Sequence, residues 1–162
     1  MAKRAKVDHL TVPMLQRSTE PFSIRFECDV QSKKNNYRRS KGGGMFKPDH
    51  VVETEMIALS QIPAEYIGLK LKHPAIILKA DMPKKNMAAD IDGIFTTILD
   101  YLVKAEVLAD DCIRQCNGMK FIDVVHEAPS KSFEVTILPD GDLKGWLLDK
   151  WDTVEHVWLD NG

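Results

Sequence analysis

Residues 90–111 read DIDGIFTTILDYLVKAEVLADD and carry the clearest structural pattern in the chain. Its apolar side chains recur at helical spacing and form one face: Ile94, Phe95, Ile98, Leu99, Leu102 and Ala105. The opposite, polar face carries Thr97, Asp100 and Lys104. We therefore expect an amphipathic helix over about residues 93–106, with an acidic pair at each end.

Strands are expected on both sides of this helix. The best example is FSIRFECDV at residues 22–30, where apolar and polar side chains alternate with the period of a half-buried strand. Apolar or alternating runs predict the other strands, which cover residues 69–81, 119–126 and 132–138. Between the last two, Ala128 and Pro129 predict a turn.

A second helix is predicted over residues 51–61, because Pro48 and Asp49 suit a helix start. Its inward side chains are expected to be Val52, Met56 and Leu59. The resulting order is strand, helix, strand, helix, strand, strand. That order predicts an α/β (α+β) fold in which one mixed sheet packs against two main helices.

The two ends of the chain differ from this central unit. Residues 1–21 form a predicted N-terminal extension, residues 22–138 the folded domain, and residues 139–162 an acidic extension that bears tryptophans. Helical spacing of apolar residues predicts an additional C-terminal helix over residues 142–159. Across 162 residues, the lack of a long apolar stretch and an odd three cysteines predict a cytoplasmic protein with no membrane segment.

A basic segment follows the first predicted strand. Residues 32–48 contain no acid and six cationic side chains, namely Lys33, Lys34, Arg38, Arg39, Lys41 and Lys47. Asn36 lies among them, and Lys84 and Lys85 form a second, smaller basic cluster. Such side chains bind nucleic-acid phosphates, although a solvated loop has the same composition. We expect no helix or strand to persist over residues 31–47, where three consecutive glycines occur.

Acidic residues flank the central helix. Asp90 and Asp92 precede it, and Asp110 and Asp111 follow it. Carboxylates are hard ligands that suit Mg²⁺ or Mn²⁺, and the bound ion would allow them to approach a phosphodiester. The same residues also suit a helix N-cap and a turn, so a structural role is equally open. Cys112 and Cys116 lack a matching second pair of zinc ligands.

Taken together, these motifs resemble the RusA family of Holliday-junction resolvases over about residues 22–138. The similar features are the two acids that open the helix, the acidic pair that closes it, the first strand with its basic loop, and Met82-Pro83-Lys84-Lys85 before the first acid. The resemblance implies a RusA-like fold and a homodimeric, Mg²⁺-dependent endonuclease with no small-molecule cofactor. It also implies paired symmetric nicks in four-way DNA junctions, a role in recombination and repair, and a bacterial, phage or prophage origin.

By position, the resemblance assigns metal binding and catalysis to Asp90, Asp92 and Asp111. The basic residues named above would then bind the DNA. Two positions depart from the family, which usually has Asn where Gly93 stands and an essential Lys where Thr96 stands. Thr96 cannot supply a positive charge, and Lys84 or Lys85 is the hypothetical replacement.

The sequence leaves open how Asp111 reaches the site, and it allows two other functions besides the endonuclease. Asp111 starts at the far end of a helix about 20 Å long, so it would act within its own chain only by a tight return, or across a dimer interface. The loss of the family lysine at Thr96 also allows a DNA-binding protein without catalysis. A metal-dependent phosphoesterase with another substrate is the third hypothesis.

Overall fold

The computed structural model describes residues 20–32, 38–86, 89–110 and 120–149. Within these ranges the main elements follow the predicted order of strand, helix, strand, helix, strand, strand. The four main strands are β1 (Phe22–Phe26), β4 (Ala75–Met82), β5 (Lys120–His126) and β6 (Ser132–Leu138). They form one mixed sheet in the order β1-β6-β4-β5, which confirms the expected α+β class.

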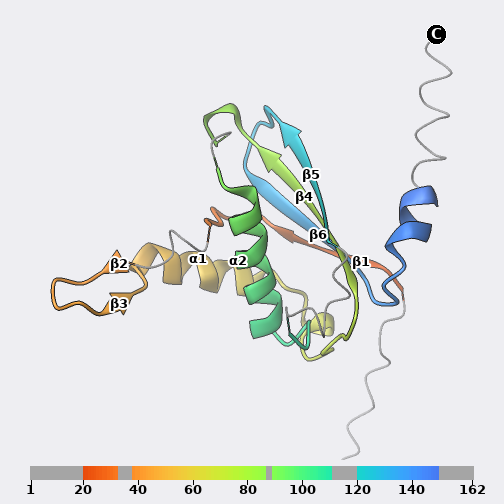
Figure 1. Ribbon diagram of the computed structural model, residues 1–162, viewed down its shortest axis with the longest axis horizontal. Helices are drawn as coiled ribbons and strands as arrows, with labels where there is room; N and C mark the ends of the chain where they lie inside the picture. The colour runs from red at the N-terminus through yellow and green to blue at the C-terminus, as the bar shows by residue number, and fades with distance from the viewer. Residues whose placement is uncertain (1–19, 33–37, 87–88, 111–119, 150–162) are drawn as a thin grey trace, which may run out of the picture.

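The direction of the strands positions the central helix. Strand β6 is antiparallel to both β1 and β4, whereas β4 and β5 are parallel. A parallel pair needs a crossover connection, and α2 (Ile91–Lys104) lies in that connection after the short helix η3 (Lys84–Asn86). The N-terminus of α2 therefore lies on the side of the sheet where β4 ends (Figure 1).

Helix α2 buries its predicted apolar face against the sheet, and Ile98 and Leu102 are fully buried. The prediction that Thr97 lies on the polar face is wrong, because this residue is 1% exposed. Its hydroxyl donates to the backbone oxygen of Gln31 at 2.9 Å. A hydrogen bond to a distant segment thus satisfies the buried hydroxyl, which removes most of the free-energy cost of burying it.

Strand β1 has the predicted alternation but is shorter than predicted. Phe22, Ile24 and Phe26 are buried, and the strand ends at Phe26 rather than at residue 30. Phe26 pairs with Phe133, close to the start of β6, so the partner strand offers little beyond that point. The next backbone N–H, that of Glu27, donates to the side chain of Gln61 instead.

Helix α1 (Asp49–Ser60) confirms the second predicted helix, but its buried face was predicted wrongly. Val52 is 42% exposed and Met56 is 67% exposed, while Leu59 is partly buried as expected. The residues that face inward are Val51, Glu55 and Ala58. The carboxylate of Glu55 is paired with two lysines, which allows this charged residue to face inward. Met56, the adjacent apolar residue that was predicted to be buried, is therefore turned towards solvent.

The expectation of no strand in the basic segment is also wrong. Strands β2 (Arg38–Arg39) and β3 (Met45–Phe46) form a short antiparallel hairpin. Figure 1 shows this hairpin projecting away from the sheet beyond the start of α1. A further short helix, η2 (Ala64–Tyr66), follows α1. Between η2 and β4, Leu71 forms an isolated bridge with Leu108.

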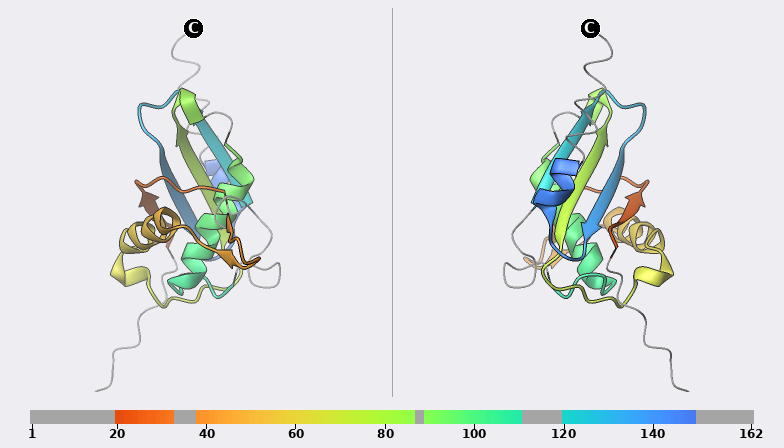
Figure 2. Two further views of the ribbon diagram at one scale, coloured as in Figure 1. Left: turned by 90° about the vertical axis from the view of Figure 1, so that its left-hand side faces the viewer. Right: turned by 90° about the vertical axis from the view of Figure 1, so that its right-hand side faces the viewer.

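The second face of the sheet has its own cover. Residues 143–149 are helical and lie on the face opposite α1 and α2 (Figure 2). Leu143, Trp146 and Leu147 pack there on Ala75 and Leu138. This confirms the start of the C-terminal helix, while its predicted continuation to residue 159 lies outside the described residues. The N-terminal extension lies outside them as well, except for residues 20–21.

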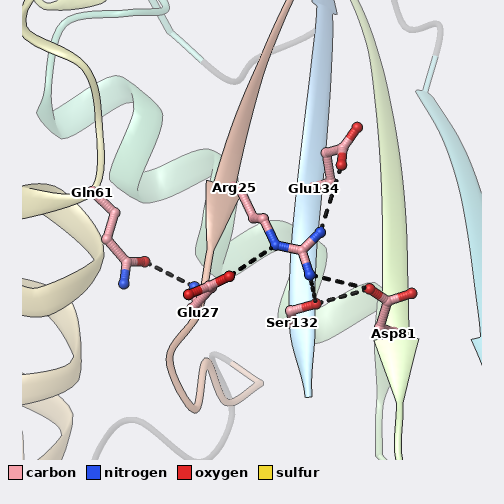
Figure 3. A network of polar contacts seen from close by, with 6 residues as sticks. All are labelled: Arg25, Glu27, Gln61, Asp81, Ser132 and Glu134. Carbon is pink, nitrogen blue, oxygen red and sulfur yellow. Dashed lines mark hydrogen bonds and ion pairs between the residues drawn. The ribbon is translucent and has the colours of Figure 1, made fainter. Parts of the chain in front are cut away.

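A polar network crosses this second face and ties three strands together (Figure 3). The guanidinium of Arg25 on β1 donates to the hydroxyl of Ser132 on β6 at 2.9 Å, and that hydroxyl donates to Asp81 on β4 at 2.8 Å. Arg25 also forms exposed ion pairs with Glu27 and Glu134. Because Asp81 is held in this network, it is not available to the opposite face, where α2 begins.

Candidate metal and nucleic-acid site

Asp90 is the N-cap of α2. Its extended backbone (φ −77°, ψ 93°) precedes the helix, and its Oδ1 accepts a hydrogen bond from the backbone N–H of Gly93 at 3.2 Å. Its Oδ2 accepts a second bond, also at 3.2 Å, from the hydroxyl of Ser32. The structural role considered for this residue is therefore real. It does not exclude metal binding, because an ionised carboxylate offers about four lone-pair positions.

Gly93 lies in the first turn of α2, close to the side chains of Ser32 and Asp90. A Cβ atom at this position would lie 2.0 Å from the Ser32 hydroxyl oxygen and 2.8 Å from Oδ2 of Asp90. Only glycine leaves room for the loop that carries Ser32 to approach the first turn of the helix. The glycine at position 93 is thus linked to the contact between Ser32 and Asp90.

Asp92 lies in the first turn of α2 and is exposed. A carboxylate in the first turn interacts favourably with the helix dipole, which is its structural contribution. Thr96 lies one turn later, and its hydroxyl donates to the backbone oxygen of Asp92 at 2.9 Å. Asp90 and Asp92 thus lie together at the start of α2, and Thr96 contributes a neutral side chain beside them.

Asp110, the described member of the second acidic pair, follows the C-terminal end of α2. The chain after the helix packs against the segment before β4, where the backbone N–H of Ala109 donates to Leu71 at 3.0 Å. With 14 residues and a rise of about 1.5 Å per residue, α2 is about 20 Å long. The chain that leads to Asp110 stays near the C-terminal end of α2, where the backbone N–H of Leu108 donates to Leu102 at 3.3 Å. Asp111, Cys112 and Cys116 lie outside the described residues. Within the described ranges, no three His, Cys, Asp or Glu side chains are grouped to hold a metal ion.

The basic segment begins beside the acidic pair. Ser32 is 4% exposed and bonds to Asp90, and the preceding residue, Gln31, accepts the hydroxyl hydrogen bond of Thr97. Two contacts with α2 therefore hold the start of this segment. The predicted DNA-binding residues Lys33, Lys34 and Asn36 follow directly and lie outside the described residues.

The other predicted cations are exposed. Arg38, Arg39 and Lys41 lie on the β2–β3 hairpin, and none of them forms an ion pair within the part of the chain that the structure describes. Lys84 and Lys85 lie in η3, between the end of β4 and the start of α2. Lys84 reaches Glu127 at 3.8 Å with 85% of its side chain exposed, a geometry that leaves it accessible to a phosphate.

Two residues near this site, Lys131 and Asp29, were not predicted from the sequence. Lys131 donates to Oδ1 of Asp29 at 2.6 Å and to the backbone oxygen of Val30 at 2.8 Å. Partial burial raises the pKa of Asp29, but the hydrogen bond and charge of Lys131, with help from Gln31 and Lys85, outweigh it and hold the pKa below its usual value. Lys131 thereby fixes the loop between β1 and the basic segment.

The far end of the basic segment is anchored by Glu55. Its carboxylate accepts a hydrogen bond from Lys47 at 2.6 Å and another from Lys104 at the end of α2. Burial raises the pKa of Glu55, but the two lysines, Lys104 first, outweigh it and keep the pKa below its usual value. The basic segment is thus attached to the folded core at both ends, through Ser32 and through Lys47.

Comparisons with known proteins assign no family to the chain. No protein-family model matches it, and no curated protein is significantly similar to it in sequence. No helix in the described ranges is long and apolar enough to cross a membrane.

Proposed function

We propose that this chain is a Mg²⁺-dependent, structure-specific endonuclease of the RusA type, which acts as a homodimer on four-way DNA junctions. The observation that carries the proposal is the hydrogen bond between Ser32 and Asp90, because it joins the start of the basic segment to the acidic end of α2. A phosphodiester bound by the cations would thereby be delivered to the carboxylates. The proposal places the protein in the bacterial cytoplasm, with a phage or prophage gene as its origin.

The donor set at the start of α2 fits a hard divalent ion. Asp90 and Asp92 are carboxylates on adjacent parts of one exposed helix end. They would hold Mg²⁺ or Mn²⁺ together with Asp111, and the ion would supply positive charge against the phosphate oxygens. No organic cofactor is needed for hydrolysis of a phosphodiester.

The chain's own residues would position the DNA. Arg38, Arg39 and Lys41 on the hairpin and Lys84 and Lys85 in η3 are exposed cations that neutralise phosphates, as Lys33, Lys34 and Asn36 are also proposed to do. Each phosphate contact releases counterions. The logarithm of the binding constant therefore falls linearly with the logarithm of the salt concentration, with a slope of about −0.9 per contact on duplex DNA. Lys84 or Lys85 would also supply the positive charge that Thr96 lacks.

The test is cleavage of a labelled synthetic four-way junction beside a linear duplex of the same sequence, in Mg²⁺ and in EDTA. Paired nicks in the junction alone are expected, and they are lost in EDTA and in Asp92→Asn. Asp92 is the better position to substitute, because its side chain does not cap the helix as that of Asp90 does. Cleavage that persists in Asp92→Asn, or that is equal on both substrates, would refute the proposal.

One observation favours a second function, a junction-binding protein without catalysis. The position of the family lysine holds Thr96, whose hydroxyl is hydrogen-bonded to the backbone oxygen of Asp92. This second function predicts tight junction binding with no cleavage in either Mg²⁺ or Mn²⁺. Cleavage by the wild type therefore decides between the two functions. If the wild type cleaves, substitution of Lys84 and Lys85 by Ala, singly and together, tests whether either replaces the lysine, because activity that survives in all three variants excludes both.

A further inference from the structure

The β2–β3 hairpin exposes two large apolar side chains among cations. Met45 is 65% exposed and Phe46 is 46% exposed, although both lie in strands. An exposed phenylalanine and an exposed methionine at adjacent positions of one strand leave apolar surface in water on a short, otherwise cationic hairpin. We therefore expect the hairpin to bind a partner that also has apolar surface.

The register of the hairpin pairs each apolar residue with an arginine. Phe46 lies opposite Arg38, and Met45 lies opposite Arg39. Directly opposed residues of two strands point to the same face, so each face of the ribbon carries one apolar side chain and one guanidinium. The partner must therefore present apolar surface and negative charge side by side.

The hairpin is a defined structure at both its tip and its base. At the tip, the backbone N–H of Ser40 donates to Gly44 at 2.8 Å, and that of Gly44 donates to the Ser40 hydroxyl at 3.2 Å. At the base, Lys47 bonds to the buried carboxylate of Glu55, directly after Phe46. Phe46 is thus presented at a fixed place next to the core, which lowers the entropy cost of using it in binding.

We propose that this hairpin is a wedge at the branch point of a DNA junction, in which Phe46 stacks on an exposed base from one face of the ribbon and Met45 contacts an exposed base from the other. This inference rests on the proposed function and names how that site recognises a branch. Base faces stack on aromatic side chains, and apolar side chains insert between base steps in DNA-bending proteins. Arg38 and Arg39 are placed to contact the phosphates on either side.

Charge decides between DNA and a protein as the partner. Residues 38–47 carry four cations, Arg38, Arg39, Lys41 and Lys47, and no acid. Only Lys47 is paired with an acid within the described residues. A surface with this charge complements a polyanion, and the branch point of a junction supplies base faces next to phosphates, which the interior of a linear duplex does not.

The test measures binding in Ca²⁺, without cleavage, to a junction that carries 2-aminopurine at the branch point and to a matched linear duplex. Phe46→Ala is expected to weaken junction binding by about 5- to 150-fold, the range found when stacking on one base is lost. Its duplex binding should change less than twofold, and the 2-aminopurine fluorescence change seen with the wild type should disappear. Phe46→Trp should restore both.

Met45→Ala and Met56→Ala form a matched pair of controls. Both remove an equally exposed methionine, at 65% and 67% exposure, but Met56 lies on α1 and not on the hairpin. Met45→Ala should weaken junction binding, and Met56→Ala should not. Because these side chains are exposed, all the variants are expected to fold, and circular dichroism verifies this.

Two results would overturn the wedge while leaving the proposed function intact. The first is junction binding and branch fluorescence in Phe46→Ala that equal those of the wild type. The second is a fall in the oligomeric mass of Phe46→Ala in sedimentation, which would assign the patch to an interface between copies. A wild type that binds junction and duplex equally would instead refute the proposed function, and the wedge with it.

Discussion

The hydroxyl of Ser32 donates a hydrogen bond to Oδ2 of Asp90 at 3.2 Å, across 58 residues of sequence. Ser32 is almost fully buried, and it is the last described residue before the basic segment continues. Asp90 caps α2 with its other oxygen. The carboxylate of Asp90 thus fixes both the start of α2 and the position of Ser32, where the basic segment begins.

This contact makes a prediction about Gly93. Gly93→Ala would normally stabilise a helix by about 1 kcal/mol. Here the added Cβ would lie 2.0 Å from the Ser32 oxygen, so we expect a loss of about 1–3 kcal/mol in the free energy of unfolding. Urea denaturation measures this loss, and Ser32→Gly in the same chain should recover part of it.

Gly42→Ala is the control for this prediction, because the nearest atom to its added Cβ is 3.9 Å away. It should change stability by less than about 0.5 kcal/mol. A Gly93→Ala variant that unfolds at higher urea than the wild type would show that Ser32 does not approach the helix as described.

Glu55 predicts an acid-sensitive anchor for the hairpin. Its pKa lies below the unfolded value of about 4.3, so its contribution is complete above that pH and is lost as the pH falls through the folded pKa. Glu55→Gln should cost about 1–3 kcal/mol at pH 7, since it leaves Lys47 and Lys104 without their partner. The cost should shrink as the pH falls below about 4.

Denaturation curves at several pH values measure this difference, and Glu53→Gln on the exposed side of the same helix is the matched control. The control should follow the wild type at every pH. A difference between Glu55→Gln and the wild type that stays constant from pH 7 to pH 3 would contradict the predicted titration.

Tyr101 predicts a loss of stability in alkali. Burial, followed by the nearby charge of Glu55, raises the pKa of Tyr101 to about 12, compared with about 10 in the unfolded chain. A group whose folded pKa is raised contributes stability that is complete below pH 10 and is lost as the pH rises towards 12. Tyr101→Phe should therefore lose less stability than the wild type above pH 10.

At pH 7 the same substitution should change stability by less than about 0.5 kcal/mol, because the hydroxyl has no hydrogen-bond partner within the described ranges. Tyr66→Phe, at a partly buried tyrosine stacked on Phe22, is the control. Denaturation at pH 7 and pH 10.5 compares the three proteins. If the three proteins lose the same free energy of unfolding between pH 7 and pH 10.5, the pKa of Tyr101 is not raised in the folded state.

The place of Asp110 predicts a site shared between two chains. Asp110, the described residue next to Asp111, follows a segment that stays near the C-terminal end of α2, and Asp90 caps the other end of this helix, which is about 20 Å long. We therefore expect a mixed dimer of one Asp90→Asn chain and one Asp111→Asn chain to contain one complete site, which is half the number in the wild-type dimer. Junction cleavage by purified mixed dimers measures this recovery.

Each variant alone is the control and should be inactive. Asn is a good N-cap, so Asp90→Asn is expected to retain the start of α2. Mixed dimers as inactive as the single variants would place all three acids of a site within one chain.

Much of the fold could be predicted from local patterns. The period of α2 and the alternation in β1 and β6 are properties of neighbouring residues, and the structure confirms these elements. The inward face of α1 could not be predicted in this way. Glu55 reads as a surface residue, and only the lysines at positions 47 and 104 make its burial favourable.

The candidate site divides along the same line. Composition and spacing are local, so they were enough to predict that Asp90 and Asp92 begin a helix and that a long acid-free segment follows the first strand. The folded chain was needed to show that Ser32 bonds to Asp90, that Gly93 makes room for it, and that Asp110 follows the opposite end of α2. Such contacts join residues far apart in the chain, and the packing of the whole sheet sets their distances.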